Sequence, residues 1–159
     1  MNDINLAVKS SLFENRGFIP KKYTARGEDI SPSFELTGIC EKAKSIAITM
    51  DDASHPLFPN YNHWLIWNLP VTGTIPEGIE AGYQVKEPKG ARQGIGYGRN
   101  KYKGPKPPLK VIHNYVFTFY VLDCECELSQ KTRKKEFLSY IEGHILQTAT
   151  YSGKFQSRT

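Results

Sequence analysis

Three stretches of the chain show the hydrophobic pattern of β-strands. In Ser45–Met50 the apolar side chains fall at every second position, which is the spacing of a strand with one buried face. The stretch His63–Leu69 is apolar on both faces apart from Asn68, as a central strand requires, and His113–Asp123 is the longest run of this kind. The pattern predicts that these three strands form the centre of a sheet.

One stretch near the C-terminus has the spacing of an amphipathic helix. After Ser129, a suitable N-cap residue, apolar residues recur every three or four positions with lysines on the opposite face, namely Phe137, Leu138, Ile141 and Ile145. Gly153 is a suitable stop residue. The 13 glycines and 10 prolines favour many short strands over long helices. We therefore expect a mainly β, mostly antiparallel domain with one C-terminal helix.

The length and composition are those of one globular domain, 1–159. The chain has 159 residues, with 39% apolar and 23% charged residues, which excludes a wholly disordered protein. The start of the chain, Met1–Asn5, lacks a basic signal-peptide region, and no apolar run is long enough to span a membrane. We expect a soluble, cytoplasmic protein without a transmembrane segment, in which Cys40, Cys124 and Cys126 are reduced thiols.

The positive charge is concentrated in one loop-rich segment. The formal net charge is +5, and Lys86–Lys110 holds eight basic residues and one acid, Glu87. Such a segment is either a solvated charged loop or a basic rim beside an anion site. Nucleic acid is not an expected partner, because two tyrosines in the segment, Tyr97 and Tyr102, are too few for a base-stacking platform.

The common catalytic signatures are absent. Gly94–Gly98 is glycine-rich, but Arg99 follows where a dinucleotide-binding motif has its third glycine, and neither a phosphate-binding loop nor a serine-hydrolase elbow occurs. The four histidines form no close ligand pair, and no second cysteine pair completes a zinc site, so we expect no metal and no cofactor. His144 is most simply a helix-surface or packing residue.

The ends of the predicted strands carry the candidate chemistry. If the first two strands form a hairpin, Asp52 and His63 meet at the same edge of the sheet. His113 and Tyr115 open the long strand and point to one face. Imidazole and phenol groups can donate hydrogen bonds to an anion, while a carboxylate fixes a histidine tautomer. The sequence therefore predicts an anion site at this edge.

Eight segments spread along nearly the whole chain carry recognisable motifs, namely Val8–Phe13, Ile19–Thr24, Gly27–Pro32, Asp51–Pro56, Asn62–Trp64, Gly104–Pro108, His113–Tyr115 and Glu142–Gly153. In this order they resemble the phosphatidylethanolamine-binding protein family, which includes Raf kinase inhibitor protein, and in particular its bacterial and archaeal branch.

The resemblance implies a Greek-key β-sandwich with a pocket for phosphate-like anions, including phospholipid head groups. The family's pocket positions match Asp52, His63, Pro107, His113 and Tyr115, and residues near the pocket mouth match Pro56 and Tyr61. The resemblance also implies a cis peptide bond at His55–Pro56. Two positions depart from the family's motifs, because Ser54 stands where a second acid is usual and Asn114 where an arginine is usual. By strand alternation, Asn114 is expected to point away from the pocket.

The expected function is binding of a phosphate-containing anion, without enzymatic turnover. The alternative implied by the resemblance is regulation of a kinase or inhibition of a serine protease through the protein surface. An enzyme that processes a phosphoester, with Asp52 and a histidine as acid and base, is a further alternative. The resemblance to the prokaryotic branch also makes a homodimer an expectation.

Overall fold

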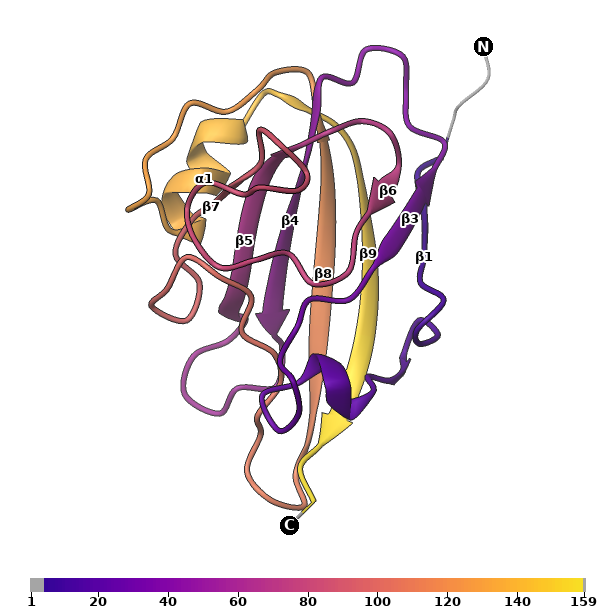
Figure 1. Ribbon diagram of the computed structural model, residues 1–159, viewed down its shortest axis with the longest axis vertical. Coiled ribbons are helices and arrows are strands. Elements are labelled where there is room, and N and C mark those ends of the chain that lie inside the picture. Colours follow the sequence, from indigo (N-terminus) through magenta and orange to yellow (C-terminus); the bar gives the residue numbers. More distant parts are fainter. Residues whose placement is uncertain (1–4, 159) are drawn as a thin grey trace.

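The computed structural model describes residues 5–158, which form two β-sheets and one α-helix (Figure 1). The larger sheet has six strands in the order β2-β9-β8-β4-β5-β7, and the smaller has three in the order β1-β3-β6. The strands are β1 (Ala7–Lys9), β2 (Gly17–Phe18), β3 (Phe34–Thr37), β4 (Ser45–Asp52), β5 (Tyr61–Leu69), β6 (Thr74–Ile75), β7 (Arg92–Gln93), β8 (Ile112–Leu122) and β9 (Ile145–Gln156). A 3₁₀ turn η1 (Lys21–Tyr23) follows β2, and the helix α1 is Lys134–Ile141.

The strand order confirms the predicted fold class. The paired strands of the described chain run antiparallel, except that β2 pairs with β9 in parallel. β4 and β5 form a hairpin, and β8 returns to lie beside β4 rather than beside β7. This crossover is of the Greek-key kind, and it places the three strands predicted from the sequence next to one another at the centre of the larger sheet.

The larger sheet is covered on both faces at β4 and β5, which explains why these two strands are apolar on both sides. On one face Phe34 of β3 lies 5.0 Å, between ring centroids, from both Phe117 and Phe119 of β8. On the other face Trp67 of β5 stacks on Phe137 of α1 at 6.1 Å. The smaller sheet and the helix therefore cover opposite sides of β4, β5 and β8 (Figure 1).

The helix is shorter than predicted, and it is not the last element. It begins at Lys134, where Glu136 accepts a hydrogen bond from the Arg133 backbone, so Ser129 is not its N-cap. The helix ends at Ile141, and Ile145 already belongs to β9, which pairs with β8 over its whole length. The long ladder with β8 thus replaces the last turns that the apolar spacing predicted.

Gly153 lies inside β9 and does not end a helix. A Cβ atom at this position would lie 2.4 Å from Cγ1 of Ile19 and 2.9 Å from a ring carbon of Phe13. The glycine is therefore required by the close approach of the segment around β2, not by a helix terminus.

Two further expectations are settled by the backbone and the cysteines. The cis peptide bond among the described residues is Glu87–Pro88, so the cis bond predicted at His55–Pro56 is wrong. The three cysteines are free thiols, as predicted. Within residues 5–158 no helix has the length and hydrophobicity of a membrane-spanning segment.

Candidate functional site

The ends of three strands meet at one edge of the larger sheet, at the lower end of the view in Figure 1. β4 ends at Asp52, which pairs with Tyr61 of β5 on one side and with Tyr115 of β8 on the other. His113 and Tyr115 are buried, whereas Asn114 between them is exposed, as strand alternation predicted. The predicted convergence of the strand ends is present.

A β-bulge decides where His63 points. The β4–β5 register shifts by one residue between Met50 and Asp51, so His63 is an extra residue in the ladder. In a regular strand His63 would share a face with Leu65, whose side chain packs beneath α1. With the bulge, the His63 ring instead lies 5.5 Å from the ring of Tyr115, on the face that carries the site.

Asp52 fixes the orientation of His113. Its Oδ2 lies 2.7 Å from Nδ1 of His113, and because a carboxylate accepts, this ring nitrogen is the donor. The other oxygen, Oδ1, accepts a hydrogen bond from the backbone N–H of Ser54 at 2.9 Å. Asp52 is 3% exposed, so both carboxylate oxygens are used inside the protein. His113 is left with Nε2 as its unbound ring nitrogen among the described contacts.

His63 is held in the same tautomer by the backbone. Its Nδ1 donates to the carbonyl oxygen of Lys103 at 2.7 Å, which leaves Nε2 without a protein partner in the described chain. Burial lowers the pKa of the imidazole below its ordinary value of 6.5, against the opposing effects of the Lys103 hydrogen bond and the charge of Asp52. In the absence of a ligand His63 is therefore predominantly neutral at pH 7.

Tyr115 supplies a hydroxyl donor. Burial, and then the charge of Asp52, raises the pKa of its phenol far above the ordinary value of 10.0, so the hydroxyl keeps its proton. The Lys106 backbone opposes this rise of the pKa only in part. The proton of that hydroxyl is thus available to an acceptor that enters between Tyr115 and the two imidazoles.

These groups line a cavity of about 150 Å³. Six of the seven sequence-predicted site residues are in its lining, namely Asp52, Pro56, His63, Pro107, His113 and Tyr115. The seventh, Tyr61, is not in the lining. It stacks on His55 with 5.1 Å between ring centroids and meets the ring of Tyr97 edge-on at 5.3 Å. Tyr61 therefore supports two lining residues from behind.

Four lining residues are not among the seven predicted site residues, namely His55, Tyr97, Pro108 and Lys106, the last of which belongs to the basic segment Lys86–Lys110. Tyr97 belongs to the glycine-rich stretch that failed the dinucleotide motif, and its φ of 53° places it in the left-handed region. Gly96 lets this loop lie directly on β5, because a Cβ there would be 2.7 Å from the Trp64 backbone nitrogen. The feature of the sequence that could have indicated Tyr97 is the pair of glycines on either side of it, Gly96 and Gly98.

The basic segment Lys86–Lys110 contributes one lysine to the cavity lining. Lys106 is the base of Lys86–Lys110 that belongs to the cavity lining. Lys103 instead lies 3.9 Å from Asp29, with its ammonium 5.8 Å from the centre of the Tyr97 ring. Lys106 therefore adds positive charge at the cavity, while Lys103 is paired beside it.

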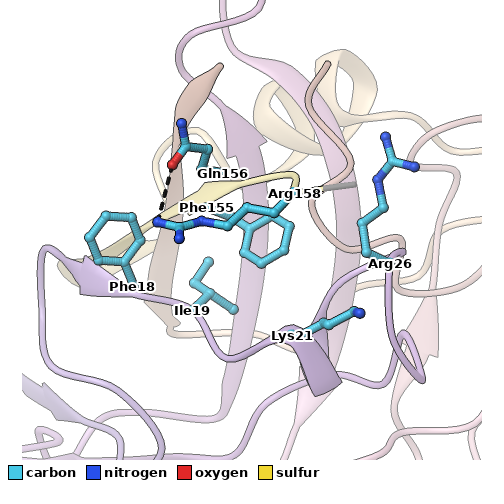
Figure 2. A pocket seen from close by; sticks show the side chains of 7 residues that line it. All are labelled: Phe18, Ile19, Lys21, Arg26, Phe155, Gln156 and Arg158. Atoms are coloured by element: carbon cyan, nitrogen blue, oxygen red, sulfur yellow. Dashed lines mark hydrogen bonds between the residues drawn. The ribbon is translucent and has the colours of Figure 1, made fainter. Parts of the chain in front are cut away.

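A larger cavity, of about 250 Å³, lies between β2, η1 and the end of β9 (Figure 2). Its floor is apolar, and Figure 2 shows Arg158 hydrogen-bonded to Gln156 while Lys21 and Arg26 lie on the other side of the cavity. The polar groups of this cavity do not point toward one common position where a ligand atom could bind. The smaller cavity, with buried and oriented polar groups, is the stronger candidate for a binding site.

Fold and site together place the chain among small two-sheet β-proteins with a polar cavity at the ends of their central strands. The chain belongs to the phosphatidylethanolamine-binding protein family, whose model matches residues 9–156. This confirms the resemblance seen in the sequence.

Similar proteins occur in archaea and in bacteria. The chain is 40% identical over 151 residues to a UPF0098 protein of Pyrococcus abyssi, which covers 94% of this chain and 84% of that protein. It is 33% identical over 154 residues to a UPF0098 protein of Aquifex aeolicus, covering 95% of this chain and 88% of the relative.

Two crystal structures have the same fold. That of CT736, a phosphatidylethanolamine-binding protein homologue from Chlamydia trachomatis, matches with a TM-score of 0.86 at 28% identity, over 98% of this chain and 99% of that one. E. coli YbcL matches with a TM-score of 0.86 over 97% and 99% of the two chains, and at 21% identity this likeness concerns the fold alone.

Proposed function

We propose that the protein binds a small phosphate-bearing anion, such as a phosphomonoester or a phospholipid head group, in the cavity between Asp52, His63, His113 and Tyr115. The observation that carries the proposal is the shared state of the two imidazoles. Each is buried, and each uses Nδ1 on a protein acceptor, so that Nε2 is kept for a ligand. A ligand therefore meets two fixed ring nitrogens and a phenol hydroxyl.

The charges around the cavity favour an anion that brings a proton with it. Neutral His63 accepts a hydrogen bond from a protonated phosphate oxygen, or takes up a proton when the anion binds and then donates. Asp52 holds the His113 ring through Nδ1 at 2.7 Å, and Tyr115 donates through its hydroxyl. Charge-assisted bonds of this type are about twice as strong as neutral ones.

The size of the cavity limits the ligand. About 150 Å³ accommodates a phosphate and a few further atoms, so the remainder of a larger ligand stays outside the mouth. We accordingly propose weak binding of inorganic phosphate, and binding without turnover. We also propose a cytoplasmic location, in which the three free cysteines stay reduced.

Titration with inorganic phosphate, followed by NMR of the imidazole groups, tests the proposal. The signals of His63 and His113 are expected to shift together with a single dissociation constant. Tyr115→Phe removes one donor to a charged group and should weaken binding by about tenfold or more. Tyr120→Phe is the matched control, because Tyr120 lies on the same strand but packs on Phe137 of α1, and it should leave the dissociation constant unchanged. Unshifted His63 and His113 signals at saturating phosphate would refute the proposal.

One observation favours the alternative of a surface regulator. Leu57 and Phe58, in the loop that leads into β5, are 76% and 57% exposed beside the cavity mouth. A kinase or a protease could dock on these side chains. A Leu57→Ser/Phe58→Ser double variant that keeps phosphate binding but no longer inhibits or modulates a kinase or protease regulated by the wild-type chain would support this function over simple anion binding.

A further inference from the structure

A second cluster of reactive side chains follows β8, separate from the anion site. The segment Asp123–Glu127 contains three acids and two cysteines in strict alternation, and no base, although the whole chain has a net charge of +5. The structure brings a histidine to this segment. His144 lies directly before β9, and its backbone carbonyl accepts a hydrogen bond from the N–H of Asp123 at 3.0 Å.

The side chains of the cluster converge. Nδ1 of His144 lies 2.8 Å from Oδ1 of Asp123, and the candidate ligand atoms of Asp123, Cys124 and His144 all lie within 4.8 Å of one another. The side chains of His144 and Asp123 are 45% and 42% exposed, so an ion can reach them from solvent. None of these residues lines the anion-binding cavity.

The backbone around Cys124 is fixed by hydrogen bonds that do not involve the side chains of Asp123, Cys124 or His144. Ser45 donates its hydroxyl to the Cys124 carbonyl at 2.5 Å. Asn68 holds both backbone groups of Cys126, accepting from the N–H at 2.7 Å and donating to the carbonyl at 3.0 Å. The Cys126 side chain is 4% exposed and packs in the apolar cluster beneath α1, so it faces away from solvent. The backbone that carries Cys124 is thus held on both sides by the sheet.

We propose that Asp123, Cys124 and His144 bind a divalent transition-metal ion of the zinc type, with the fourth coordination position open to solvent. Thiolate, imidazole and carboxylate are the ligands that Zn²⁺ prefers, at distances of about 2.0–2.3 Å. In a tetrahedral site such ligands lie roughly 3.5 Å apart. Binding of the ion replaces the hydrogen bond between His144 and Asp123, so that the neutral imidazole binds through a nitrogen that carries no proton, and the Cys124 thiol releases its proton to solvent.

The sequence did not reveal this cluster, because its histidine lies 20 residues beyond Cys124 and matches no ligand motif. The pairing of β8 with β9 closes that separation. The expectation of no metal rested on the spacing of residues close together in the sequence. Such spacing cannot show a ligand that strand pairing brings near from a distant part of the chain.

Titration of the reduced protein with Co²⁺ tests the site, because cobalt reports its ligands by absorption. The expected result is one ion per chain, with a thiolate-to-cobalt charge-transfer band and the strong visible bands of tetrahedral cobalt, all lost when Zn²⁺ is added. Cys124→Ser should abolish the charge-transfer band, and His144→Gln should weaken binding by about tenfold or more.

The matched control is Cys40→Ser, which removes a thiol outside the cluster and should leave the spectrum and stoichiometry unchanged. Circular dichroism establishes that each variant is folded, and Asp123→Asn is a second ligand variant of nearly the same shape. A charge-transfer band that survives Cys124→Ser, binding unaffected by both His144→Gln and Asp123→Asn, or the absence of any thiolate band with the wild-type chain would overturn the proposal.

Discussion

The backbone N–H of Asn114 donates a hydrogen bond to the hydroxyl of Ser54 at 2.9 Å, so the two positions that depart from the family's motifs are in direct contact. Ser54 in turn donates its own backbone N–H to Asp52. The turn after β4 is thereby attached both to the neighbouring strand and to the carboxylate of the site. An acid at position 54 and an arginine at position 114 would be neighbours, so the two departures belong together.

Ser54→Asp should weaken anion binding, because it adds a negative charge two residues from Asp52. An added charge about 4 Å away in a solvated site costs about 1 kcal/mol, or roughly fivefold in the phosphate dissociation constant. Ser54→Asn is the uncharged control of the same size and should leave the constant near that of the wild type. Adding Asn114→Arg to Ser54→Asp should recover most of the loss, with a coupling energy of about 0.5–1 kcal/mol in the double-mutant cycle. Independent effects of the two substitutions would show that the positions are not coupled.

The sequence predicted the residues of the site better than the path of the backbone around them. Alternation along β8 correctly placed His113 and Tyr115 on one face, because one face of that strand is buried while the other is exposed or half-buried, which fixes its register. Local pattern could not show the bulge at His63, which arises from pairing with β4. The apolar spacing that predicted a longer helix runs into Ile145, where pairing with β8 has the stronger effect. Tyr97 was missed because its position depends on close contact between a loop and β5.

The stability of the free protein should fall as the pH is lowered below about 6.5, in part through His63. Burial lowers the pKa of this imidazole in the folded state, so below pH 6.5 the unfolded chain binds more protons than the folded one. The contribution of neutral His63 to stability is complete above pH 6.5. It is lost progressively as the pH falls from 6.5 to the lowered pKa of the folded state. Urea unfolding at a series of pH values measures this, and the difference between the wild type and His63→Gln should diminish as the pH decreases. A difference that stays constant between pH 7.5 and 5 would contradict the lowered pKa.

Anion binding should show the opposite dependence on pH. An anion stabilises protonated His63, so its affinity should rise as the pH falls, by at most about tenfold per pH unit for one linked proton. Sulfate is the suitable probe, since its charge does not change over this range, whereas that of phosphate does. Calorimetric titration with sulfate at pH 7.5, 6.5 and 5.5 measures the effect. His63→Gln should flatten the profile, and an unchanged profile would assign the linked proton to another group.

Both site histidines should carry their neutral-state proton on Nδ1, since Nδ1 faces an obligatory acceptor in each case. This tautomer is readily distinguished by long-range ¹⁵N–¹H NMR correlations. Asp52→Ala removes the acceptor for His113 alone and should release that ring to the Nε2–H form, while His63 keeps its tautomer through Lys103. The same variant should lose about 3 kcal/mol of stability, because it leaves buried donors without an acceptor. An Nε2–H signal for His113 in the wild type would contradict the orientation on which the proposed function rests.

The loop that carries Tyr97 should tolerate a methyl group at one of its glycines and not at the other. At Gly96 a Cβ would lie 2.7 Å from the Trp64 nitrogen and 2.9 Å from Oδ1 of Asn62. Gly96→Ala should therefore cost about 2–3 kcal/mol in urea unfolding and displace Tyr97 from the cavity. Gly98 has a φ of +78°, but a Cβ there would meet no atom within 4 Å, so Gly98→Ala should cost only the backbone strain of about 1 kcal/mol. If Gly96→Ala weakens phosphate binding and Gly98→Ala does not, the weaker binding is due to the displacement of Tyr97 and not to a general loss of stability. Equal effects of the two substitutions would mean that contact of the loop with β5 does not set the shape of the site.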